Sequence, residues 1–111
     1  MRFENVKPID RQSAEKAFSS GENSKICDAL LRATYHVPDW QWVQEKCIYF
    51  LSSKNNKIKS LAVICLGHLA RIHRDIDVEI VLPLLNDLLD DPDFSGCAED
   101  AIDDIRMFVE K

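Results

Sequence analysis

Glycine, proline and long apolar runs are all scarce in this chain. Its 111 residues include three glycines and four prolines, which excludes a collagen-like or low-complexity chain. No apolar run approaches the roughly 18 residues that a membrane-spanning helix needs. The start, MRFENVKPIDRQ, lacks the apolar and small-residue regions of a secretory signal. We therefore expect a soluble, cytoplasmic protein that has no membrane partner.

The four cysteines do not form a metal-binding or redox motif. Cys27, Cys47, Cys65 and Cys97 are 20, 18 and 32 residues apart, so there is no C-x-x-C pair. Each lies among apolar neighbours at helical spacing, which predicts small buried thiols rather than disulfides or metal ligands. We expect neither a bound metal nor a cofactor.

The histidines and the acidic pairs do not combine into a recognisable catalytic motif. His68 and His73 are five residues apart, so they do not share a helix face as an i, i+4 metal-binding pair does. His36 lies in a hinge, and we expect all three to be surface or cap-type histidines. The acidic pairs lack the glycine-bearing loop of an EF-hand. The chain is therefore predicted not to be an enzyme.

Helical periodicity runs through almost the whole chain, in which 46% of the residues are hydrophobic. Apolar residues recur at a period near 3.6, and no segment shows the sustained alternation of a half-buried strand. Asp10 and Asp39 are candidate N-caps, as is Asn23 or Ser24. The pattern predicts an all-α protein in which the fourth helix, with its broad apolar stripe, lies at the centre. The expected helices span residues 10–19, 24–35, 40–53, 56–73, 78–89 and 94–109.

The apolar pattern of the helices repeats at an interval of about 36 residues. A shift of 36 aligns Ala62, Leu66 and Leu69 with Ala98, Ile102 and Ile105. Recurrence of a two-helix unit at this interval is typical of a solenoid, in which each hairpin hides an apolar flank against its neighbour. We expect one domain, residues 1–111, built as a right-handed α-solenoid of about three helical hairpins.

Charge is distributed unevenly along the chain, whose formal net charge is -5. Residues 1–74 hold 12 Lys/Arg against 7 Asp/Glu, whereas residues 75–111 hold 2 against 12. So acidic a region repels nucleic acid and attracts a basic protein. The two interpretations that stay open are a docking face for a basic partner and a solvated surface that maintains solubility. Direct binding of nucleic acid is not expected.

One stretch resembles a known repeat family. The run NNKIKSLAVICLGHL, residues 55–69, resembles the second helix of a HEAT repeat: a polar turn, an apolar residue, a basic residue, a small alanine and then Leu-Gly. Residues 91–105 resemble the same signature but depart from it, because Ser95 replaces the basic residue and Asp103 the closing glycine. The resemblance covers about residues 38–110 and implies HEAT-like hairpins.

A closer resemblance is to small HEAT-like immunity proteins of bacterial polymorphic toxin systems, including contact-dependent growth inhibition. It is carried by WVQEKCIYFL at 42–51, LGHLARIH at 66–73 and AEDAIDDI at 98–105. The resemblance implies a protein that binds a cognate toxin domain in a 1:1 complex and blocks its active site. The toxin domain of such a system is often a nuclease, which would here be basic, an EndoU-type ribonuclease being one candidate.

Seven side chains are candidates for toxin binding. On the last helix, four acidic residues are expected to face toxin Lys/Arg: Glu99, Asp100, Asp103 and Asp104. Tyr35 or Trp40 is expected to act as an aromatic anchor. His68 is expected to contact the partner by its polar edge. Trp40 is expected to be exposed, and Trp42 to be in the core. The alternative function is a HEAT-like interaction adaptor outside toxin systems. An enzyme such as a lyase or a HEAT-type DNA glycosylase ranks last, because no cofactor motif is present and the acidic balance is unsuited to DNA.

Overall fold

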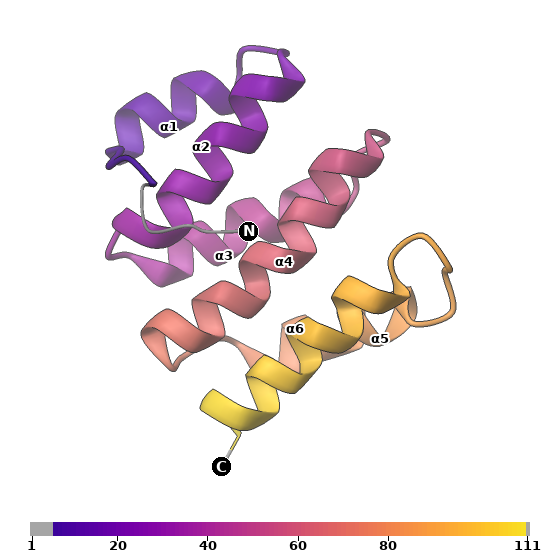
Figure 1. Ribbon diagram of the computed structural model, residues 1–111. Coiled ribbons are helices and arrows are strands. Elements are labelled where there is room, and N and C mark those ends of the chain that lie inside the picture. The colour runs from indigo at the N-terminus through magenta and orange to yellow at the C-terminus, as the bar shows by residue number, and fades with distance from the viewer. Residues whose placement is uncertain (1–5, 111) are drawn as a thin grey trace.

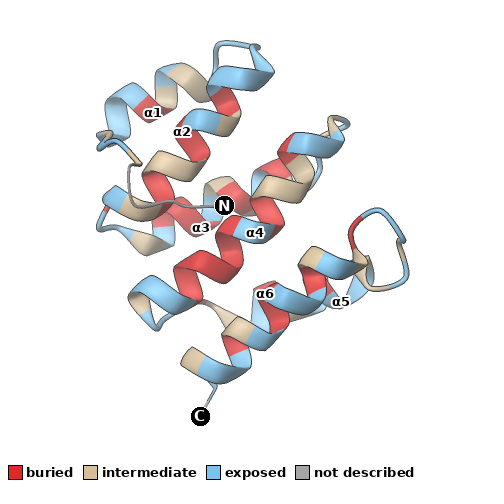
Figure 2. Cartoon of the chain, in the orientation of Figure 1, coloured by how far each residue is buried: buried red, intermediate tan, exposed pale blue. Residues whose placement is uncertain are grey.

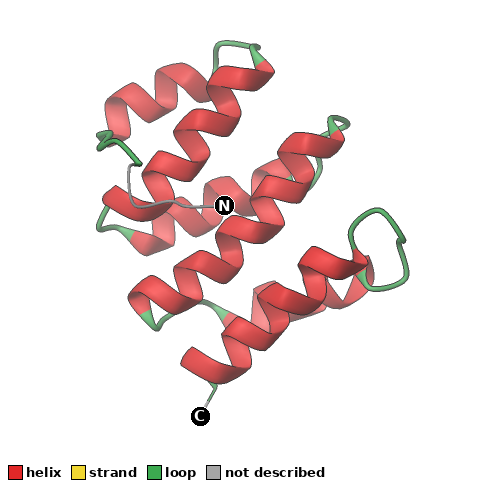
Figure 3. Ribbon diagram, in the orientation of Figure 1, coloured by secondary structure: helices red, strands yellow, loops and turns green. Residues whose placement is uncertain are grey.

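The chain folds into helices alone. The computed structural model describes residues 6–110, and across that range it contains helices and loops but no strand (Figure 3). The predicted all-α class is confirmed. None of the helices in these residues is both long and apolar enough to cross a membrane. The helices are α1 (Arg11–Phe18), α2 (Asn23–His36), α3 (Trp40–Phe50), α4 (Asn56–His73), α5 (Val78–Leu88) and α6 (Ser95–Phe108).

The helices form three consecutive hairpins that stack on one another. Helices α2, α4 and α6 lie side by side, and α3 and α5 lie behind them (Figure 1). The long helix α4 packs against α2 on one side, α6 on the other and α3 behind. Since each hairpin covers the apolar flank of the next, the observed stack confirms the predicted solenoid-like arrangement, with α4 at its centre.

Polar side chains cap the first turn of three helices, α1, α3 and α4. The Asp10 carboxylate accepts a hydrogen bond from the Ser13 N–H at 2.7 Å, and the Asp39 carboxylate accepts one from the Trp42 N–H at 3.2 Å. Both predicted N-caps are thus confirmed, because each satisfies a donor that the first helical turn leaves unpaired. The predicted cap of α2 is wrong: Glu22 occupies that position and makes no capping hydrogen bond through its side chain.

The third helix is shorter than predicted. It ends at Phe50 rather than at residue 53, because the next three N–H groups bond to carbonyls three residues back, although the Leu51 N–H also bonds to the Cys47 carbonyl. Leu51, Ser52 and Ser53 donate to Ile48, Tyr49 and Phe50, respectively, at 3.1–3.3 Å. Such i→i−3 bonds tighten the last turn and close the helix.

The helical spacing predicts that Ile72 of α4 and Ile80 of α5 belong to the apolar stripes of their helices, but both are exposed. Ile72 is 42% exposed and Ile80 is 49% exposed. Each occurs at a helical spacing that puts it near the buried stripe, but no neighbouring helix covers it sufficiently. Periodicity identifies the apolar face of a helix. How much of that face is buried depends on the helices that pack against it.

The core is built around α4. The apolar stripe of this helix is broad because it faces several neighbours. Seven of its apolar residues are buried (Figure 2): Ile58, Ala62, Val63, Cys65, Leu66, Leu69 and Ala70. Cys47 of α3 is buried too, and the pKa of its thiol is raised well above the ordinary value by its hydrogen bond with Cys65 and by burial. Cys27 and Cys97 are only half-buried, so full burial is confirmed for two of the four thiols.

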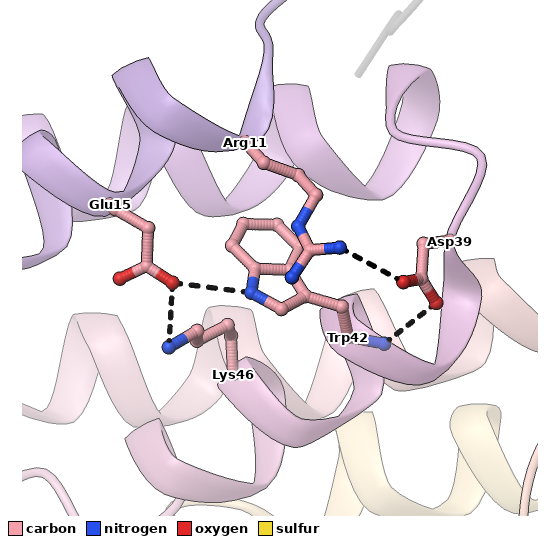
Figure 4. Close-up of polar contacts among 5 residues, drawn as sticks. All are labelled: Arg11, Glu15, Asp39, Trp42 and Lys46. Atoms are coloured by element: carbon pink, nitrogen blue, oxygen red, sulfur yellow. Dashed lines mark hydrogen bonds and ion pairs between the residues drawn. The ribbon is translucent and has the colours of Figure 1, made fainter.

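Trp42 joins the first hairpin to α3, as Figure 4 shows. Its indole Nε1–H donates to the Glu15 carboxylate at 3.2 Å, and the Arg11 guanidinium lies 4.8 Å from its ring centroid. Glu15 also pairs with Lys46 at 3.0 Å, and Arg11 with Asp39 at 3.2 Å. The expectation that Trp42 is a core residue is confirmed, since its side chain is 7% exposed. These contacts assign it a structural role.

Candidate functional site

A groove runs between α4 and α6, and we refer to it as the α4–α6 groove. It has a volume of about 500 Å³. Three of the four residues predicted on the acidic last helix line it, together with His68, the one candidate residue on α4. Helix α4 contributes Ile64, Gly67, His68 and Arg71, and α6 contributes Cys97, Asp100, Ala101, Asp103 and Asp104.

Gly67 allows the two helices to approach closely along the floor of the groove. A Cβ atom at this position would lie 3.1 Å from the Ala101 Cα and 3.1 Å from an Asp104 carboxylate oxygen. Because the facing residue of α6 is itself an alanine, the backbones come together with little side chain between them. The glycine that follows Leu66 is thus explained by close helix packing. Its lack of a side chain determines how near the α6 carboxylates lie to α4.

The α6 side of the groove is an acidic wall. Asp100, Asp103 and Asp104 all line it, and Asp104 is the half-buried member. Burial raises the pKa of the Asp104 carboxyl, Asp100 and Asp103 act in the same direction, and Arg71 opposes them. Asp100 and Asp104 are i, i+4 neighbours of like charge, an arrangement that costs a helix about 0.2–0.5 kcal/mol. The wall therefore presents negative charge that its own helix does not offset.

The α4 side of the groove contains His68, next to Tyr35 of α2. The two ring centroids are 5.5 Å apart, so the stack of hairpins brings together two predicted residues that are 33 positions apart in the sequence. His68 is 8% exposed, which corrects the expectation of a surface or cap-type histidine. Burial foremost, and then Arg71, lowers the pKa of the His68 imidazole. The surroundings of the ring therefore favour its neutral form.

Three of the predicted residues do not line the groove: Tyr35, which contacts the groove residue His68 from α2, and Glu99 and Trp40, which lie elsewhere. Glu99 is exposed on the other side of α6, where it lines a smaller depression of about 270 Å³ with Asn86, Leu89 and Arg106. Trp40 is the first residue of α3, and it is half-buried and packed against the core rather than exposed. Glu99 precedes the groove-lining Asp100 in the sequence. Because successive residues of a helix point in different directions, Glu99 lies on a different side of α6 from the groove.

Arg71 and Ile64 line the groove but were not among the seven residues predicted from the sequence. Arg71 is exposed, and Ile64 is 37% exposed on the same helix face. The signal that would have found them is their spacing: Ile64, His68 and Arg71 stand at i, i+4 and i+7, which is one face of a helix. In the part of the chain that the structure describes, no three His, Cys, Asp or Glu side chains come together as a metal site.

Comparison with known proteins gives a match over nearly the full length. A chain in the crystal structure of a CDI complex from Cupriavidus taiwanensis is similar to this chain, with a TM-score of 0.86 and 33% sequence identity. The match covers 97% of this chain and 97% of that chain. No protein-family model and no curated protein matches, so the assignment to HEAT repeats stays a prediction.

Proposed function

This chain belongs to the same family as that component of the Cupriavidus taiwanensis CDI complex, and on this basis we propose that it is an immunity protein of contact-dependent growth inhibition. It binds one cognate toxin domain in a 1:1 complex in the cytoplasm and neutralises it, and it performs no chemistry of its own. The observation that carries this proposal is the 33% identity over 97% of both chains. A likeness of that extent reflects a common family rather than a shared helical architecture alone.

The α4–α6 groove is the proposed toxin-binding surface. It is concave and has an apolar floor where Ile64 and Ala101 lie, and the acidic wall borders it on the α6 side. A cleft that binds an RNA or DNA backbone is rich in Lys/Arg, so a wall of carboxylates is complementary to it. This supports a basic nuclease, such as an EndoU-type ribonuclease, as the toxin. Inhibition would then be steric and electrostatic, since the immunity protein occupies the cleft.

Tyr35 and His68 extend this surface towards α2. Their rings are in contact, with His68 buried and Tyr35 half-buried, so the pair supplies stiff contact area at little cost in conformational entropy. We include His68 because it lines the groove, and Tyr35 because its ring contacts His68. We place Glu99 and Trp40 at or beyond the edge of the binding surface, because neither lines the groove.

Affinity capture tests the proposed function. The immobilised chain is exposed to an extract of the cells that encode it, the retained protein is identified by mass, and its toxicity is measured with and without the chain. We expect a toxin domain whose activity the chain abolishes at a 1:1 ratio. Retention of a non-toxic assembly component instead would favour the adaptor function, and turnover of a substrate by the purified chain would contradict both.

Charge-neutral variants test the surface. Replacement of Asp100, Asp103 and Asp104 by Asn is expected to weaken toxin binding by about 2–5 kcal/mol for each desolvated charge, mainly through faster dissociation. The matched control replaces three exposed acidic residues outside the groove with Asn: Asp87, Asp90 and Asp93. It changes the net charge equally. Equal loss of affinity in the two variants would mean that net charge matters and the groove does not.

A further inference from the structure

The α4–α6 groove is not uniformly negative. Arg71 lies in it among the carboxylates and is the only Lys or Arg among its lining residues. The neighbouring His68 is buried, and its surroundings favour the neutral imidazole. An arginine in the lining works against a groove that served merely to attract any basic surface, because like charges repel.

Arg71 is exposed and forms no ion pair with the residues that the structure describes. The ion pairs within residues 6–110 join Arg11 with Asp39, Lys25 with Glu22, Arg32 with Asp28 and Lys46 with Glu15. Arg71 influences the pKa values of Tyr35 on α2, His68 on α4 and Asp104 on α6 through space. Because Arg71 lines the groove and is exposed, its N–H donors are available to a partner that binds there.

An arginine in this position recognises a particular chemical group. Its planar guanidinium carries five N–H donors in a fork that matches a carboxylate in a two-point interaction. A partner that covers the groove, with its apolar residues Ile64 and Ala101, would exclude water from such a pair, and partial desolvation strengthens it. The acidic wall beside Arg71 at the same time attracts cations. The chemistry of the groove is thus bipolar, with one positive point bordered by three carboxylates.

We propose that Arg71 is a specificity-determining residue of toxin binding, which pairs with a carboxylate of the toxin while the acidic wall binds Lys/Arg side chains that flank that carboxylate. This inference rests on the proposed immunity function. The partner surface has one acidic side chain among basic ones. Arg71 also disfavours partners that are basic throughout, because these would place a cation against it.

Two probes separate recognition from general charge attraction. The first is the toxin domain retained by the wild-type chain, and the second is poly-L-lysine, a polycation without carboxylate side chains. Arg71→Ala is expected to weaken toxin binding by at least about 30-fold, the lower limit for truncating one partner of a buried charge pair. The same variant is expected to bind poly-L-lysine more tightly than the wild type. Arg71→Lys keeps the charge but not the fork, so its affinity for the toxin should fall in between.

Arg106→Ala is the matched control. Arg106 is an exposed arginine of α6 that lines the depression on the α5 side rather than the groove. The Arg106→Ala substitution changes the net charge by the same amount as Arg71→Ala. It therefore reports how much of any gain in poly-L-lysine binding is due to net charge alone. We expect it to change the toxin affinity by less than about twofold, as is typical of exposed charges. Circular dichroism of every variant confirms that the helices are retained.

The outcomes distinguish the two proposals. If the wild type binds and neutralises the toxin but Arg71→Ala does so equally well, the inference is overturned and the immunity function stands. If Arg71→Ala and Arg106→Ala behave alike with both probes, Arg71 contributes only net charge and the inference also fails. If the wild type retains no toxin, the immunity function fails and the inference with it. Restoration of binding between Arg71→Glu and a toxin in which one groove-facing Asp or Glu is changed to Arg would support the inference directly.

Discussion

The close contact at Gly67 leads to a prediction about stability. Gly67→Ala places a methyl group 3.1 Å from the Ala101 Cα and 3.3 Å from its Cβ. The side chain of Asp104 can swing away from the new methyl group, but the backbone of α6 cannot. The two helices must therefore separate by a few tenths of an ångström along the interface that borders the groove.

Two opposing terms determine the size of the effect. Alanine is a better helix former than glycine by about 1 kcal/mol in a helix interior, and an extra methyl group in a packed interface costs about 1–3 kcal/mol. We therefore expect Gly67→Ala to lower the free energy of unfolding by about 1 kcal/mol. Gly96→Ala is the matched control, because a Cβ at Gly96 has no neighbour within 4 Å. Near the first turn of α6 it should raise the free energy of unfolding by about 0.5 kcal/mol.

Urea unfolding followed by circular dichroism measures both variants. Linear extrapolation gives the free energy of unfolding, and an unchanged slope shows that the same surface becomes exposed. The quantity of interest is the difference between the two alanine variants, about 1.5 kcal/mol from the terms above. If Gly67→Ala proves as stable as Gly96→Ala or more so, the close packing of α4 on α6 is not present and the described shape of the groove is wrong.

Three further predictions concern other contacts. Asn55→Ala removes the cap that accepts the Lys57 and Ile58 N–H groups at 3.0 and 3.1 Å, and should lower the free energy of unfolding in urea by about 1 kcal/mol. Trp42→Ala should lower it by about 3–5 kcal/mol, measured by calorimetry. The folded chain raises the pKa of Asp104, so it binds that proton more tightly than the unfolded chain does. Relative to Asp104→Asn, wild-type stability should therefore increase as the pH falls through this raised pKa.

Each of these results has a clear contrary outcome. An unchanged stability of Asn55→Ala would mean that water caps α4 equally well. Trp42→Phe retains the ring contacts but not the hydrogen bond to Glu15, so a loss as large as that of Trp42→Ala would contradict the packing argument. A stability difference between wild type and Asp104→Asn that does not vary with pH would show that the carboxyl group is not perturbed by its surroundings.

Much of the fold follows from local properties of the sequence. The period of 3.6 identifies the helices, and polar residues such as Asp10 and Asp39 locate helix starts because a short side-chain oxygen reaches the unpaired N–H groups there. The broad apolar stripe of α4 predicts its central position, since only a helix with several neighbours buries so wide a face. The acidic character of α6 is likewise evident from composition alone.

The candidate site depends more on tertiary structure. The sequence predicts that Asp100 and Asp104 share a helix face, but which neighbour that face meets depends on the stacking of hairpins. The contact of Tyr35 with His68, the burial of His68 and the position of Arg71 opposite the acidic wall all join segments from different hairpins.

By itself, the sequence determined the helices, their order, the central role of α4 and the negative charge of α6, because each depends on spacing and composition within one segment. The tertiary structure alone decided that Glu99 and Trp40 lie outside the groove, that Ile72 and Ile80 stay exposed, and that one arginine lies among three carboxylates. The physical reason is that the covering of a helix face is a property of two helices, and their distance depends on contacts as small as that of Gly67 with Ala101.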